Sequence, residues 1–181
     1  MSCCQQATRD YVYIRALELE LADAAGTPLT SGARTTAVEL RATLQFRLDV
    51  VAQGPTGAPF LGSAYARSCP SEGSKGLKAA VAEVVLTSTG LFNGVVAGQS
   101  LNGFVRCSLG NSIGRSGADF PLSQLADSLN SNKDQGLRLN RPVFLRISPK
   151  PTDNARQQFQ LRVRGGNAPD LTQTTPEIVW N

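Results

Sequence analysis

The chain contains no histidine. Histidine is the usual general base for serine and cysteine nucleophiles, a common ligand of metals, and the side chain whose unperturbed pKa lies nearest physiological pH. Its absence excludes histidine-based catalytic triads, histidine-ligated metal sites and imidazole pH switches. An enzyme with this sequence would need carboxylates or lysine as its acids and bases.

Long apolar runs, aromatic residues and clustered charge are also scarce. No stretch approaches the roughly 20 apolar residues of a membrane-spanning helix, and no signal-peptide pattern is visible, which fits a cytosolic chain or an exported one whose signal was removed. Aromatic residues make up 6% of the chain, too few for an obvious base-stacking platform. The net charge is +4, but lysine and arginine never form a block of five, so we expect no nucleic-acid partner.

The sequence does contain an alternation of apolar and polar residues, the pattern of half-buried β-strands. The clearest case runs from Val38 to Leu48, where every second residue is apolar. The first segment places its apolar residues on one expected buried face, with Arg15 as the exception: Tyr11, Tyr13, Leu17, Leu19 and Leu21. Further strands are expected at residues 64–66, 80–87, 104–107, 137–139, 143–147, 159–163 and 178–180.

Turns and one helix are expected between these strands. Glycine and proline mark turns at residues 23–28 and 165–167, the latter joining the last two strands, and glycine recurs through a long crossover from Thr89 to Gly117. Asp119 is a candidate helix N-cap, and helical spacing follows it at Leu122, Leu125, Ala126 and Leu129.

Seven or eight short strands and a single helix predict an all-β fold. Specifically, we expect an antiparallel β-sandwich, immunoglobulin-like in architecture, with one short helix near residues 120–130. Residues 1–9 are expected to form an N-terminal tether, and residues 10–181 a single domain.

The acidic, polar and glycine-rich segments match no known catalytic, metal-binding or phosphate-binding motif. The carboxylates are dispersed over strands and turns, and Asp153-Asn154 and Asn130 to Asp134 lack the ligand spacing of a calcium loop. The segment Gly110 to Gly117 lacks the lysine of a phosphate-binding loop. We therefore expect no metal, no cofactor and no catalytic residue.

The four cysteines carry a more specific expectation. Cys3 follows a small residue, Ser2, as the lipidated cysteine of a bacterial lipoprotein would, and adjacent Cys3 and Cys4 do not have zinc-ligand spacing. Cys3 is thus the predicted lipidation site. Cys4, Cys69 and Cys107 are candidates for a disulfide, either Cys4 with Cys69 or Cys69 with Cys107.

Several segments together resemble Bacteroidetes-type bacterial lipoproteins of unknown function. They are Ser2-Cys3-Cys4, Leu17 to Leu21, Tyr65-Ala66 with Cys69, Val85 to Ser88, Phe92-Asn93 with Gly98 to Asn102, and Phe159 to Val163 with Thr174 to Ile178. The resemblance implies an exported, lipid-anchored β-sandwich with no known activity, and it supplies no catalytic residues.

These observations predict a non-enzymatic cell-envelope lipoprotein domain, held at the outer membrane through Cys3, that acts as a surface binding or structural module. A protein or glycan partner is expected to meet its longest loops, Gln53 to Phe60 and Phe92 to Gly117.

Two alternatives stay open. The first is a carboxylate-dependent hydrolase acting on glycans, which requires acids that only folding brings together. The second is a weak polyanion-binding module, which would use arginines interpreted as outward-facing strand residues. Those arginines are Arg15, Arg41, Arg47, Arg138, Arg146, Arg162 and Arg164.

Overall fold

The computed structural model describes residues 11–51, 75–110, 119–131, 141–165 and 169–181. Several expectations fall outside these ranges: the tether, Cys3, Cys4 and Cys69, the strands at 64–66 and 137–139, and the loop from Gln53 to Phe60. They stay predictions.

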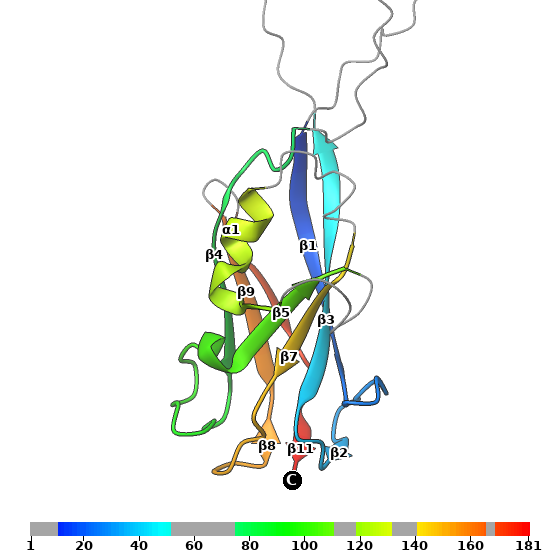
Figure 1. Ribbon diagram of the computed structural model, residues 1–181, viewed down its shortest axis with the longest axis vertical. Helices are drawn as coiled ribbons and strands as arrows, with labels where there is room; N and C mark the ends of the chain where they lie inside the picture. Colours follow the sequence, from blue (N-terminus) through cyan, green and yellow to red (C-terminus); the bar gives the residue numbers. More distant parts are fainter. Residues whose placement is uncertain (1–10, 52–74, 111–118, 132–140, 166–168) are drawn as a thin grey trace, which may run out of the picture.

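The described chain is all-β with one short α-helix, as expected (Figure 1). Its strands are β1 (Tyr11–Ala22), β2 (Arg34–Thr35), β3 (Leu40–Val51), β4 (Val81–Ser88), β5 (Val105–Leu109), β6 (Phe120–Pro121), β7 (Val143–Ile147), β8 (Arg156–Gln157), β9 (Phe159–Gly165), β10 (Leu171–Thr174) and β11 (Ile178–Trp180). The helices are η1 (Asn102–Phe104) and η2 (Leu122–Gln124), both 3₁₀, and α1 (Leu125–Asn130).

The strands form two main sheets and one small one. The five-stranded sheet has the order β1-β3-β7-β5-β6, the second has the order β10-β9-β4, and both are antiparallel throughout. In the small sheet β2-β11-β8, however, β11 runs parallel to β2. A parallel pair needs a long connection, which the chain between β2 and β11 supplies. The antiparallel expectation is confirmed for the main sheets and wrong for this pair. The immunoglobulin-like arrangement stays a prediction.

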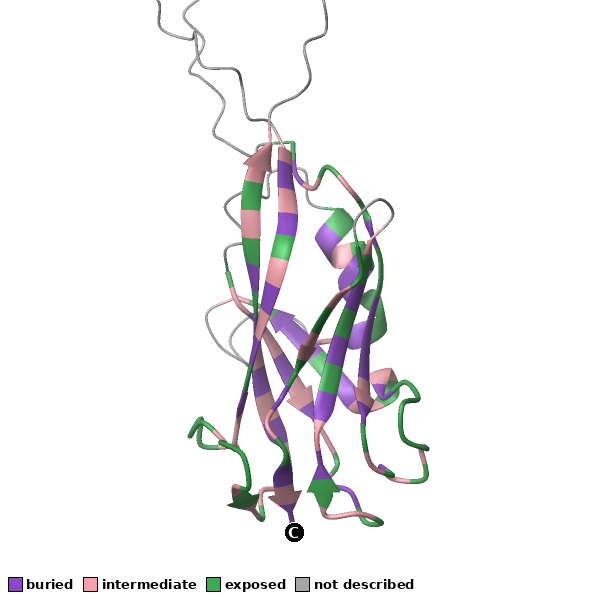
Figure 2. Cartoon of the chain, turned by 180° about the vertical axis from the view of Figure 1, so that it is seen from behind, coloured by how far each residue is buried: buried purple, intermediate pink, exposed green. Residues whose placement is uncertain are grey.

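One hydrophobic core joins the two main sheets and the helix (Figure 2). The expected helical face is confirmed, because the four predicted apolar residues, Leu122, Leu125, Ala126 and Leu129, are buried. The prediction that Asp119 is the N-cap of this helix is wrong. No side chain caps η2 or α1, and the carboxylate of Asp119 instead accepts a hydrogen bond of 2.8 Å from Arg146.

The predicted faces of the first two long strands need correction. The register of β1 against β3 shifts at Arg15, which is an extra residue in a β-bulge, so Val12 and Ile14 are buried and Tyr11 and Tyr13 are only half-buried. A single period-two pattern cannot pass through a bulge. Val38 lies before β3 and is 78% exposed, because the strand begins two residues later.

The predicted turn at residues 165–167 does not lead directly from β9 to the closing strand β11. Between Gly165 and the closing strand the chain forms β10, which pairs antiparallel with β9. Its sequence, Leu171-Thr-Gln-Thr174, has one apolar residue and therefore no alternation that a sequence pattern could detect.

The outer edge of β4 is closed by two asparagine side chains. The amide of Asn130 accepts from Val81 N at 2.9 Å and donates to Val81 O at 2.7 Å. The amide of Asn102 accepts from Leu86 N at 3.1 Å and donates to Val84 O at 2.8 Å. Each amide therefore supplies one donor and one acceptor, as a neighbouring strand would. Closing an edge in this way prevents it from pairing with another chain.

We predict that Asn102→Ala and Asn130→Ala each lower the free energy of unfolding by about 1–3 kcal/mol, because each leaves a donor and an acceptor of β4 unpaired. Urea denaturation measures this. The control is Gln99→Ala, which removes an exposed amide and should change stability by no more than about 0.5 kcal/mol. Losses no larger than that of the control would show that the asparagines do not support the edge.

Candidate binding surface at one end of the domain

Loops far apart in sequence meet at one end of the molecule. Residues 89–98, between β4 and β5, and residues 148–155, between β7 and β8, lie with β2, β8 and β11 at the end opposite to the start of β1 (Figure 1). We call this region, together with residues 180–181, the hairpin end. It contains part of the predicted loop from Phe92 to Gly117.

A tight hairpin occupies the first loop. Phe92 and Val95 exchange two backbone hydrogen bonds of 3.0 and 2.9 Å around Asn93 and Gly94, whose φ angles are 47° and 81°. Positive φ at both central positions belongs to a type I′ turn, and Asn-Gly is its preferred sequence. The sequence pattern predicted a glycine-rich crossover here and no hairpin. The Asn93-Gly94 pair was the signal that could have located the hairpin.

The second loop holds the hairpin turn in place. Asp153 accepts hydrogen bonds from the backbone N–H groups of Asn93, at 3.0 Å, and Gly94, at 2.7 Å. The side chain of Asn93 in turn accepts from Thr152 N at 3.1 Å. The backbone N–H of Gly94, followed by that of Asn93, lowers the pKa of Asp153 below its ordinary value of 3.8. The two loops therefore form a single unit.

A buried amide connects the hairpin to the sheets. Gln157 is 0% exposed, and its Nε2 donates to Leu91 O at 2.9 Å and to Asn154 O at 2.7 Å. Its Oε1 accepts a hydrogen bond of 2.5 Å from Ser88 Oγ. The neighbouring Gly90 leaves no room for a side chain, because a Cβ there would meet Asn154 Nδ2 and lie 2.9 Å from Arg156 O.

The hairpin packs inward through one aromatic ring and presents two apolar side chains outward. Phe92 is fully buried, with ring centroids 5.4 Å from Phe104 and 6.1 Å from Phe159 and Trp180. Leu91 and Val96 flank the turn and are 40% and 58% exposed. Both side chains are therefore open to contact from outside the domain, on a hairpin that its own hydrogen bonds and the ring of Phe92 hold in place.

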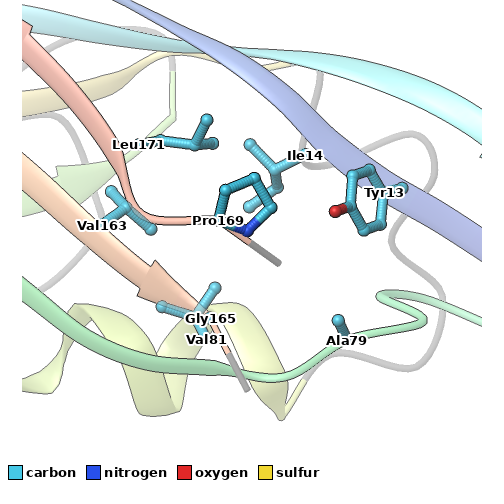
Figure 3. A pocket seen from close by; sticks show the side chains of 8 residues that line it. All are labelled: Tyr13, Ile14, Ala79, Val81, Val163, Gly165, Pro169 and Leu171. Atoms are coloured by element: carbon cyan, nitrogen blue, oxygen red, sulfur yellow. The ribbon is translucent and has the colours of Figure 1, made fainter. Parts of the chain in front are cut away.

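Two hollows differ in what they can hold. At the hairpin end, an open hollow of about 390 Å³ is lined by Lys150, Thr152, Asp153, Asn154 and Asn181, among others. A second hollow, at the opposite end, lies between β1, β9 and β10 (Figure 3) and is lined mainly by apolar side chains, including those of Tyr13, Ile14 and Leu171. At about 20 Å³ it has room for one water molecule and no larger ligand.

Cys107 lies on β5 and is 1% exposed, as a free thiol. Burial raises its pKa to about 12, so the reactive thiolate is disfavoured at neutral pH. A free Cys107 does not support its pairing with Cys69, whereas the pairing of Cys4 with Cys69 lies outside the described ranges and stays a prediction. Among the described residues, no group of three acids or cysteines is placed to hold a metal ion, and no helix has the length and apolar character to cross a bilayer.

Most arginines on the sheets are paired with acids. The ion pairs are Arg15 with Asp49, Arg41 with Glu39, Arg47 with Glu18, Arg146 with Glu39 and Asp119, and Arg164 with Glu83 and Asp170. The described arginines of the predicted set are exposed or half-buried, but they lie on both main sheets, and carboxylates neutralise much of their charge locally. Arg138 lies outside the described residues.

No protein-family model matches the chain, and comparison with curated proteins and with solved structures finds no match.

We predict that lowering the pH releases the hairpin turn. Because the pKa of Asp153 is depressed in the folded state, the stabilisation from its carboxylate is complete above the unfolded value of 3.8 and is lost as pH falls through the folded value. In NMR titrations the amide shifts of Asn93 and Gly94 should move with a midpoint below 3.8. Asp153→Asn should remove the transition. Unchanged amide shifts in the wild-type protein across this range would contradict the assigned contacts.

Proposed function

We propose that this protein is a non-enzymatic cell-envelope lipoprotein domain, anchored through Cys3, that binds a partner protein through the hairpin end. The observation that carries the proposal is the outward display of Leu91 and Val96 on a hairpin fixed from below by Phe92, Gln157 and Asp153. A loop held in one conformation loses little entropy on binding, which favours affinity.

The direction of the chain supports this arrangement. β1 begins at Tyr11, at the end opposite to the hairpin, and runs 12 residues toward it (Figure 1). At about 3.3 Å per residue, such a strand is about 40 Å long. An anchor at Cys3 would enter the domain at the far end, so the hairpin would point away from the membrane.

The exposed chemistry favours a protein over a glycan. Leu91 and Val96 are aliphatic, while Trp180, the only tryptophan of the chain, is 1% exposed and offers no ring face for a sugar. The acid of the hairpin end, Asp153, already holds the turn, and Glu177, just before β11, pairs with Arg156 at 3.2 Å. This makes a carboxylate hydrolase at the hairpin end the less supported reading.

We expect a photo-reactive amino acid at position 91 or 96 to cross-link a partner in cells of the source organism. The matched control is position 109, because Leu109 is also 40% exposed but lies at the end of β5, outside the hairpin end. The double variant Leu91→Ser/Val96→Ser should weaken binding of the captured protein tenfold or more, which corresponds to about 1.4 kcal/mol.

Equal cross-linking from position 109, or undiminished binding by the double variant, would contradict the proposed surface. Fractionation of the same cells tests the anchor. The Cys3→Ala protein should leave the membrane fraction, and its retention there would contradict lipidation at Cys3.

A further inference from the structure

Three arginines stand in one row across the five-stranded sheet. Arg41 on β3 is directly opposite Arg146 on β7, and Arg146 is directly opposite Arg106 on β5. Residues opposite each other in antiparallel strands share a face, and like charges in that position destabilise a sheet. Neighbouring strands are about 4.8 Å apart, so the row spans about 10 Å.

Two carboxylates offset only part of this charge. Arg146 Nη2 lies 2.8 Å from Asp119 Oδ2, and its Nε lies 3.9 Å from Glu39. Arg41 Nη2 approaches Glu39 no closer than 3.6 Å, which is longer than a hydrogen bond. Arg106 Nη2 donates instead to the neutral carbonyl oxygen of Asp119, at 2.6 Å. Arg41 and Arg106 therefore lack a hydrogen-bonded anion among the described residues.

Unmet hydrogen-bonding groups are concentrated at the same place. Within the described ranges, the buried side-chain atoms without a hydrogen bond are Arg41 Nε, Ser108 Oγ and Asp119 Oδ1. Ser108 is 4% exposed and lies two residues after Arg106, on the same face of β5. Two of these three groups are donors, as an anion requires, and the third is an acceptor that a protonated oxygen of a ligand would satisfy.

We propose that this row is a binding site for an oxyanion group, a phosphate or a carboxylate, held by Arg41 and Arg106 with Ser108 beside them. Planar guanidinium groups match the oxygen spacing of both anions, and a hydrogen phosphate also carries a hydroxyl for Asp119. The site is on the sheet face, apart from the hairpin end, so it does not depend on the function proposed above.

The test uses the full chain and follows the arginine side-chain N–H signals by NMR. Sodium phosphate and sodium acetate are titrated separately, each against sodium chloride at equal ionic strength, so that the two arms distinguish the anions. We expect a saturable response of the Arg41 and Arg106 signals to at least one of them. Arg106→Gln, which alters an exposed side chain, should weaken that response tenfold or more.

The matched control is Arg162→Gln, because Arg162 is an exposed strand arginine on β9 of the other sheet. It should bind as the wild-type protein does. Responses no different from those to chloride, or equal losses in Arg162→Gln and Arg106→Gln, would overturn the proposal. An Arg106→Gln protein that keeps its backbone spectrum but binds as tightly as wild type would overturn it too.

Discussion

The buried amide of Gln157 is the contact on which the hairpin end depends. A side-chain amide at 0% exposure is tolerated only when its donors and acceptor are satisfied, and here they join Leu91, Asn154 and Ser88. These partners come from three different parts of the chain: the hairpin, the loop before β8, and the end of β4. Because leaving a buried polar group unpaired costs about 1–3 kcal/mol, displacing any one of them from the amide is costly.

Elsewhere in the fold, too, backbone groups of one element form hydrogen bonds with side chains of another. Asn102 and Asn130 complete the edge of β4, and Asp153 completes the turn of the hairpin. Around these contacts the core is apolar and closed, with Phe92, Phe159 and Trp180 packed together beneath the hairpin. The result is a frame in which side-chain contacts hold the two described loops of the hairpin end against the sheets. The arginine row is the exception, since its groups are incompletely satisfied among the described residues.

Much of the fold could be predicted from the sequence, because period-two burial is a local signal. The strands β3, β4, β7, β9 and β11 and the apolar face of the short helix were found in this way. The bulge at Arg15 and the polar strand β10 were not predicted. A bulge interrupts the period-two pattern, and β10 has a single apolar residue and so no alternation to detect. The hairpin end was anticipated only as a long loop. Its construction depends on contacts such as Asn93 with Asp153, 60 residues apart, which no local pattern encodes.

Hydrogen exchange shows whether Gln157 keeps the hairpin rigid. We expect the amides of Phe92 and Val95 in the wild-type protein to be protected nearly as well as those of β4. In Gln157→Leu, which has a similar shape but no donors, these two amides should exchange at least tenfold faster while the amides of β3 and β7 keep their protection. Fast exchange of Phe92 and Val95 in the wild-type protein, or no change in the variant, would contradict it.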